Sequence, residues 1–219
     1  MATDKVGKPA TRATHDVLRA EAPPLDPIFN PESEALPQSE IWPYPEKYVS
    51  KWMTKSGEEV LIRPIRPEDE PEMIKFHKDL SERSVYLRYF QPLKFSRRTA
   101  HERLTRICFI DYNREMALVV ERSTPQGERE IIAVGRMSKP HGVPEAELAA
   151  LVRDGCQGKG LGSELYRRLV QIARDEKLQK VHSNMLRENA EMIAICRHLG
   201  FHLTADQEGD NLIVGELVL

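Results

Sequence analysis

Hydrophobic and polar residues alternate with a period of two in a series of short stretches, a pattern typical of strands. These stretches are residues 52–54, 59–63, 116–121, 130–137, 146–153, 180–186, 201–204 and 212–219. Between them, apolar residues recur every three to four positions, which predicts helices at residues 67–80, 81–90, 99–108, 163–177 and 189–198. Strands and helices in this order predict a mixed α/β layer architecture.

The segment 157–162 reads Gln-Gly-Lys-Gly-Leu-Gly and joins a predicted strand to the helix at 163–177. A strand that turns through glycines into a helix directs several free backbone N–H groups at one point, and the helix dipole adds partial positive charge there. The natural ligand is therefore a phosphate or pyrophosphate. A Walker loop is excluded because Lys159 is followed by Gly160. The dinucleotide fingerprint is excluded because Ser163 stands where its last glycine is required.

Composition narrows the class of protein. The 219 residues carry a net charge of −2, which gives no reason to expect a nucleic-acid partner. No apolar run approaches the roughly 20 residues that span a bilayer, so we expect no membrane partner. The three cysteines form no C-x-x-C pair, which predicts a reduced, cytoplasmic protein. The seven histidines lack metal-ligand spacing, so we expect no metal site.

Proline content divides the chain into two regions. Residues 1–45 hold eight of the fifteen prolines and show little apolar periodicity, so we expect a disordered tail. Residues 46–219 carry all the predicted strands and most of the predicted core. We therefore expect one folded domain at 46–219.

Glu147 is the acid–base candidate of the strand before the glycine loop. Period-two alternation places it on one strand face with Glu145, Ala149 and Leu151. Because it is the deepest carboxylate of that face, we expect apolar neighbours that raise its pKa toward the range of a general base. The alternative is an edge-strand glutamate paired with an arginine, and the spacing alone favours neither interpretation.

The segment Gln157-x-x-Gly160-x-Gly162 resembles the acyl-CoA-binding signature of the GNAT family of N-acetyltransferases. The resemblance implies a mixed, mostly antiparallel sheet flanked by helices, with a splay between the strand before the loop and the next strand. It also implies acetyl-CoA as the acyl donor, with pantetheine along the splayed strand and pyrophosphate on the loop. By position, the cofactor-binding residues are Leu151, Val152, Arg153, Gln157, Gly158, Lys159, Gly160, Gly162, Ser163 and Asn189.

Longer segments resemble one branch of this family, the bacterial protein lysine acetyltransferases that are often fused to ADP-forming acyl-CoA synthetase modules. These segments are residues 62–69, 80–90 and 146–149. In that branch the matching glutamate is the proposed general base, which is Glu147 here. The resemblance thus implies acetylation of a protein lysine, for example in an acyl-CoA synthetase, by direct attack in a ternary complex.

Two alternatives stay open at the level of sequence. The acceptor could be a small-molecule amine, or the domain could sense acyl-CoA without turnover. The chain departs from the family pattern at the residue that would protonate the leaving thiolate. Many family members have a tyrosine shortly before the Gly-Phe pair of the last helix, and this chain has Cys196 there, either as the acid or as a core residue. The sequence predicts neither an oligomeric state nor a preference for acetyl over longer acyl groups.

Overall fold

A computed structural model of the protein describes residues 43–205 and 211–219. The predicted tail at residues 1–45 lies outside the described residues, apart from residues 43–45. No helix of the described residues is both long and apolar enough to cross a membrane.

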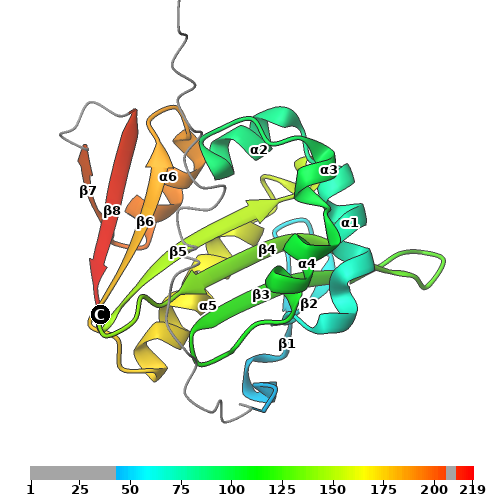
Figure 1. Ribbon diagram of the computed structural model, residues 1–219, viewed down its shortest axis with the longest axis horizontal. Helices are drawn as coiled ribbons and strands as arrows, with labels where there is room; N and C mark the ends of the chain where they lie inside the picture. Colours follow the sequence, from blue (N-terminus) through cyan, green and yellow to red (C-terminus); the bar gives the residue numbers. More distant parts are fainter. Residues whose placement is uncertain (1–42, 206–210) are drawn as a thin grey trace, which may run out of the picture. The chain divides into compact units, whose positions relative to one another are not determined.

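Eight strands of the described chain form one sheet in the order β1-β2-β3-β4-β5-β6-β8-β7 (Figure 1). The strands are β1 (Ser50–Met53), β2 (Glu59–Pro64), β3 (Glu115–Ser123), β4 (Arg129–Ser138), β5 (Glu145–Val152), β6 (Lys180–Leu186), β7 (His202–Ala205) and β8 (Leu212–Val218). Neighbouring strands are antiparallel except for β5 and β6, which are parallel. The sheet is therefore mixed and mostly antiparallel, as predicted.

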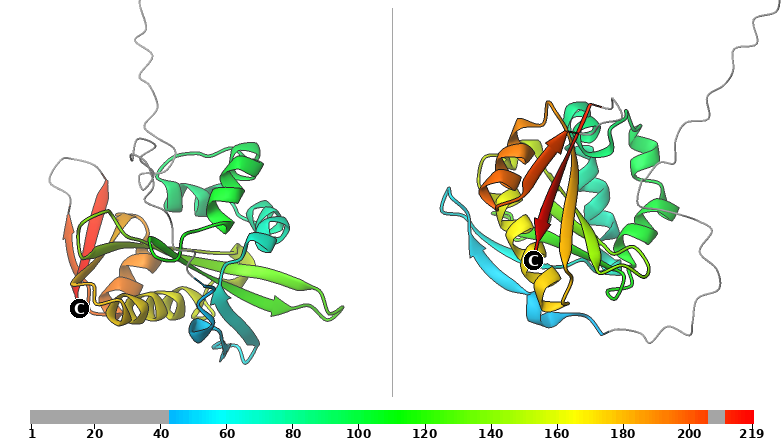
Figure 2. Two further views of the ribbon diagram at one scale, coloured as in Figure 1. Left: turned by 60° about the horizontal axis from the view of Figure 1, so that its bottom comes forward. Right: turned by 90° about the vertical axis from the view of Figure 1, so that its left-hand side faces the viewer.

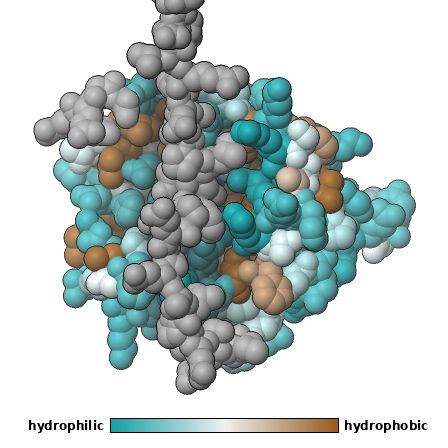
Figure 3. Space-filling view, in the orientation of Figure 1, coloured by the Kyte–Doolittle hydropathy of each residue, from teal (hydrophilic) through white to brown (hydrophobic). Residues whose placement is uncertain are grey.

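The helices lie on both faces of this sheet. They are α1 (Glu70–Lys78), α2 (Glu82–Tyr89), α3 (Phe95–Arg98), α4 (His101–Cys108), α5 (Leu161–Asp175) and α6 (Ala190–His198), with short 3-10 turns η1 (Glu46–Tyr48), η2 (Pro67–Asp69) and η3 (Asp154–Cys156). Helices α1–α4 pack on one face, and α5 and α6 pack on the other (Figure 2). In the orientation of Figure 1 the visible surface is mainly hydrophilic, with apolar residues in small separate groups (Figure 3), as is usual for protein surfaces.

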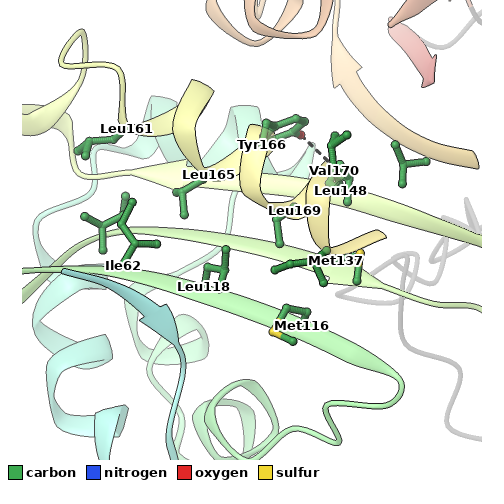
Figure 4. Close-up of a cluster of buried hydrophobic side chains, with 14 of the residues drawn as sticks. Ile62, Met116, Leu118, Met137, Leu148, Leu161, Leu165, Tyr166, Leu169 and Val170 are labelled. Carbon is green, nitrogen blue, oxygen red and sulfur yellow. Dashed lines mark hydrogen bonds between the residues drawn. The ribbon is translucent and has the colours of Figure 1, made fainter. Parts of the chain in front are cut away.

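Each face of the sheet has its own hydrophobic core. Leu118 of β3 points to the α5 side, where it meets Leu165 and its neighbours (Figure 4). The next residue, Val119, points to the α1–α4 side and packs with Phe76. Because both faces are covered, the central strand is apolar at consecutive positions rather than at alternate ones. Burying each such side chain contributes about 1.5–3 kcal/mol.

The structure adds one short helix to those that the pattern predicts. The predicted helix at 99–108 is present as α4 (His101–Cys108), and α3 (Phe95–Arg98) precedes it with a break at Thr99. The Thr99 hydroxyl donates to the carbonyl of Phe95 at 2.9 Å, and the carbonyl of Ala100 starts the next turn by accepting from Leu104 N–H at 3.0 Å. The break follows from this local competition for backbone groups, which hydrophobic periodicity does not report.

Strands β5 and β6 separate soon after they meet. Only Glu145–Glu147 pair with Lys180–His182, although β5 continues to Val152 and β6 to Leu186. On its other side β5 stays paired with β4 over the length that β6 has left. The predicted splay is present, and it leaves one edge of β5 without a neighbouring strand.

Candidate active site

The glycine loop turns the end of β5 into the start of α5. Gly158 and Gly160 have φ values of 75° and 87°, a left-handed conformation that costs other residues roughly 1–2 kcal/mol. Gly160 is also the N-cap of α5. The first N–H groups of the helix have no partner within it, so they are available to an anion at this position.

The side chain of Gln157 bonds inward rather than only lining the loop. Its amide nitrogen Nε2 donates to Ser84 Oγ and to the carbonyl of Val152, each at 3.2 Å. Ser84 belongs to α2 and Val152 ends β5. Gln157 therefore joins the glycine loop to both elements.

Asp154 makes a second link between the loop and α2 that sequence reasoning missed. Its carboxylate accepts from Ser81 N–H at 2.9 Å, from Ser81 Oγ at 2.6 Å and from Ser84 Oγ at 2.9 Å. Burial alone would raise the pKa of Asp154, but these hydrogen bonds to the charged form outweigh it, so the pKa lies below its usual value. The only signal in the sequence was an acid directly after a strand together with serines at the start of a helix.

The tip of the β1–β2 hairpin packs against the glycine loop. The carbonyl of Lys159 accepts from Lys55 N–H at 3.1 Å, and Lys159 Nζ lies 3.3 Å from Glu58 Oε2. The charge of Lys159, a predicted pyrophosphate ligand, is thus partnered by a carboxylate of the hairpin.

The unpaired edge of β5 presents alternate backbone groups. Arg153 N–H donates to Ile132 O at 2.9 Å, toward β4. Because the backbone N–H and C=O groups of successive residues in a strand point to opposite sides, those of Ala150 and Val152 face the gap left by β6. The guanidinium of Arg153 is committed to ion pairs with Asp79 and Glu130. Of the predicted pantetheine contacts, the backbone of Val152 is therefore the one directed into the gap.

Glu147 lies where β5 and β6 part. It is half-buried and in register with His182 of β6, and Asn184 Nδ2 lies 3.5 Å from its Oε1. These neighbours are polar, so the prediction of apolar neighbours for Glu147 was wrong. Among the described residues no arginine or lysine forms an ion pair with Glu147, which disfavours the interpretation as a paired structural glutamate.

Tyr166 of α5 closes the narrow end of the gap. Its buried hydroxyl donates to the carbonyl of Leu148, at 3.1 Å, and lies 2.7 Å from Ser183 Oγ on β6 (Figure 4 shows the ring against β5). Desolvation raises the pKa of this phenol. Leu148 directly follows Glu147, the last residue of β5 that pairs with β6, so the hydroxyl gives a hydrogen bond to a carbonyl that β6 no longer reaches. The sequence did not predict this role of Tyr166.

Two residues of α6 have distinct positions. Asn189 caps the helix, since its Oδ1 accepts from Met192 N–H at 3.2 Å. Cys196 is fully buried in the α5-side core, and desolvation raises the pKa of its thiol to about 12. Its surroundings are those of a core cysteine.

Comparison with known proteins identifies the family. Residues 59–202 match the family model described as the acetyltransferase (GNAT) domain. The chain belongs to the GNAT family. It is therefore an acetyltransferase of the class that moves an acetyl group from acetyl-CoA to an amine.

Individual relatives agree with this assignment. An acetyltransferase of Pseudomonas aeruginosa is 28% identical over 163 residues, covering 74% of this chain and 86% of the relative. The crystal structure of the GNAT domain of S. lividans PAT superposes with a TM-score of 0.71 at 26% identity, covering 81% of this chain and 100% of that one. RimJ of Mycobacterium smegmatis, in complex with CoA-disulfide, shares the fold with a TM-score of 0.60 at 15% identity, covering 78% and 86%.

Proposed function

We propose that this GNAT acetyltransferase acetylates the side-chain amine of a protein lysine, with Glu147 as the general base. The observation that carries the proposal is the position of Glu147, a carboxylate without an ion pair among the described residues, at the point where β5 and β6 part. This point adjoins the gap that would receive the donor and an open face of the sheet that would receive the acceptor.

The donor is held by backbone groups. Pantetheine lies along the free edge of β5, where the N–H of Val152, between Leu151 and Arg153, is directed into the gap. The pyrophosphate lies on the residues from Gln157 to Ser163 at the N-terminus of α5. The CoA-disulfide in the M. smegmatis RimJ structure supports a CoA site in this fold. Asn189, at the start of α6, completes the set.

The chemistry follows from this arrangement. Glu147 takes a proton from the lysine ammonium, directly or through water, and the free amine nitrogen attacks the thioester carbon. The C–N bond forms and the C–S bond breaks, so the acetyl group passes to the lysine in a ternary complex. The attacking nitrogen releases its second proton to solvent as the amide forms. CoA leaves as the thiolate and takes a proton from solvent, because Cys196 is enclosed in the core.

A protein acceptor is favoured by the sheet face beside Glu147, which no helix of the described residues covers over β7 and β8. In register with it across the sheet lie His182 of β6, Glu216 of β8 and His202 of β7. Helices α1–α4 cover this face over the central strands, whereas β8 and β7 carry no described helix on it (Figure 1), and His202 is exposed. A polypeptide carrying a lysine can reach Glu147 along such a face, while a small amine would need a closed pocket.

The resemblance of residues 62–69, 80–90 and 146–149 to the protein lysine acetyltransferase branch adds the acceptor class. An active-site lysine of an acyl-CoA synthetase is the substrate we propose, and the catalytic unit is residues 46–219.

The test is transfer of labelled acetyl from acetyl-CoA to a purified acyl-CoA synthetase. Wild type should label one synthetase lysine, and Glu147→Gln should reduce transfer by at least a hundredfold while binding acetyl-CoA with unchanged affinity. Glu145→Gln is the matched control, because Glu145 shares the strand face but pairs with Lys180 at 3.2 Å. This control should keep its activity.

Three results would contradict the proposal. Equal activity of Glu147→Gln and Glu145→Gln would remove Glu147 as the base. Labelling of small amines but of no protein would place the acceptor among small molecules. Tight binding of acetyl-CoA with no transfer to either class would indicate a module that senses acyl-CoA.

A further inference from the structure

Lys55 lies on the glycine loop although it is far from it in the sequence. Its N–H donates to the carbonyl of Lys159 at 3.1 Å. Its side chain runs over Gly160, so closely that a methyl group placed on Gly160 would come within 3.3 Å of Lys55 Cγ and Cε. The ammonium at the end of this stem is therefore held next to the N-terminus of α5.

The turn that carries Lys55 is well fixed. Thr54 N–H donates to Glu58 O at 2.9 Å, Gly57 N–H to Thr54 O at 3.0 Å, and Glu58 N–H to Thr54 Oγ1 at 3.0 Å. Thr54 itself is buried. Because these bonds fix the backbone, only the side-chain rotamers of Lys55 need to be ordered by a ligand, which lowers the entropic cost of binding.

The two lysines at the loop differ in their charge partners. Lys159 Nζ is paired with Glu58, whose other carboxylate oxygen lies 3.6 Å from Arg122. The ammonium of Lys55 has no hydrogen bond or ion pair within residues 43–205 and 211–219. Lys55 is thus the uncompensated cation beside the loop, whereas the sequence had pointed to Lys159.

We propose that Lys55 binds a phosphate group of acetyl-CoA. This inference rests on the donor site described under the proposed function. The helix N-terminus supplies N–H groups in fixed directions, and the ammonium adds a full charge with three donors that can follow the phosphate. A hairpin outside the β5–loop–α5 unit thereby becomes part of the donor site.

Isothermal titration of acetyl-CoA and of acetyl-dephospho-CoA tests the proposal. Lys55→Ala should weaken binding of acetyl-CoA by about tenfold or more, as expected for a charge-assisted hydrogen bond. Lys51→Ala is the matched control, because Lys51 lies on the same hairpin but pairs with Glu59 at 2.8 Å, away from the loop. It should bind like wild type, and Lys55→Arg should recover most of the lost affinity.

The second ligand tells which phosphate is bound. If Lys55→Ala weakens the binding of acetyl-CoA but not that of acetyl-dephospho-CoA, the contact is with the 3′-phosphate. If it weakens the binding of both ligands equally, the contact is with the diphosphate. Either result supports the proposal, provided that the variant melts at the wild-type temperature. Lys55→Ala binding as tightly as Lys51→Ala would overturn it. If the wild type itself does not bind acetyl-CoA, the proposed donor site is wrong, and the role proposed for Lys55 is wrong as well.

Discussion

At the scale of single residues, the glycine loop depends on backbone conformations rather than on side chains. Gly160 combines a φ of 87° with the close approach of the Lys55 stem. A side chain there is disfavoured twice, first by the left-handed conformation and then by contact with Lys55. Gly155, two residues into η3, has neither constraint, since a methyl group placed on it would meet nothing within 4 Å.

This difference gives a paired prediction. Gly160→Ala should destabilise the fold by about 1–2 kcal/mol and weaken acetyl-CoA binding by tenfold or more, because the loop must change its conformation. Gly155→Ala should change stability by less than about 0.5 kcal/mol and leave the affinity unchanged. Urea denaturation and calorimetric titration of both variants measure these effects. Two variants that behave alike would show that the loop tolerates other conformations.

At the scale of elements, the decisive feature is the parting of β5 and β6. Two strands that separate leave backbone groups without partners, and a buried carbonyl without a hydrogen bond costs about 1–3 kcal/mol. Tyr166 supplies the missing donor from α5 by bonding Leu148 O, while its oxygen also meets Ser183 of β6. The helix therefore stabilises the gap at its narrow end.

Tyr166→Phe should lower the free energy of unfolding by about 1–2 kcal/mol and also weaken acetyl-CoA binding several-fold, because the end of the gap loses its fixed geometry. Tyr112→Phe provides the comparison. It removes a similar hydroxyl, which donates to Ile65 O at 2.6 Å away from the gap. That variant should lose stability without losing affinity. The idea fails if both variants bind acetyl-CoA as wild type does.

At the scale of the whole domain, two separate cores on the two faces of one sheet must form together. The α1–α4 core contains a buried histidine, His77. Desolvation, reinforced by the charges of Arg103 and Arg98, lowers the pKa of His77 to about 3. The side chain is therefore neutral in the folded protein throughout the physiological range of pH.

This burial has a consequence for acid stability. In the unfolded chain a histidine titrates near pH 6.5, so the unfolded state binds the extra proton as the pH falls from about 6.5 to 3. The contribution of His77 is complete above pH 6.5 and is lost at about 1.4 kcal/mol per pH unit below it.

His77→Gln removes this titration while keeping a polar side chain. The difference in unfolding free energy between wild type and variant should shrink by about 2–3 kcal/mol between pH 7 and pH 4.5. Urea denaturation at a series of pH values measures it. A constant difference across this range would mean that His77 takes up a proton in the folded protein as readily as in the unfolded chain.

The sequence alone was sufficient wherever the physical cause is local. The strand and helix periods predicted the elements, because each buried face repeats along its own segment. The glycines at 158 and 160 predicted the turn, since a left-handed backbone is a property of the residue itself. The capping role of Asn189 is local for the same reason.

The tertiary structure decided what depends on residues distant in the chain. Glu58 and Lys159 are 101 positions apart, and only folding shows that their pairing leaves Lys55 as the cation of the loop. The polar setting of Glu147 likewise depends on Asn184 of another strand, and the bonds of Asp154 depend on α2. Hydrophobic periodicity reports which face of an element is buried, but not which element covers it. The sequence therefore predicted the donor loop, whereas the charges around it and the neighbours of the base came from the packing of separate elements.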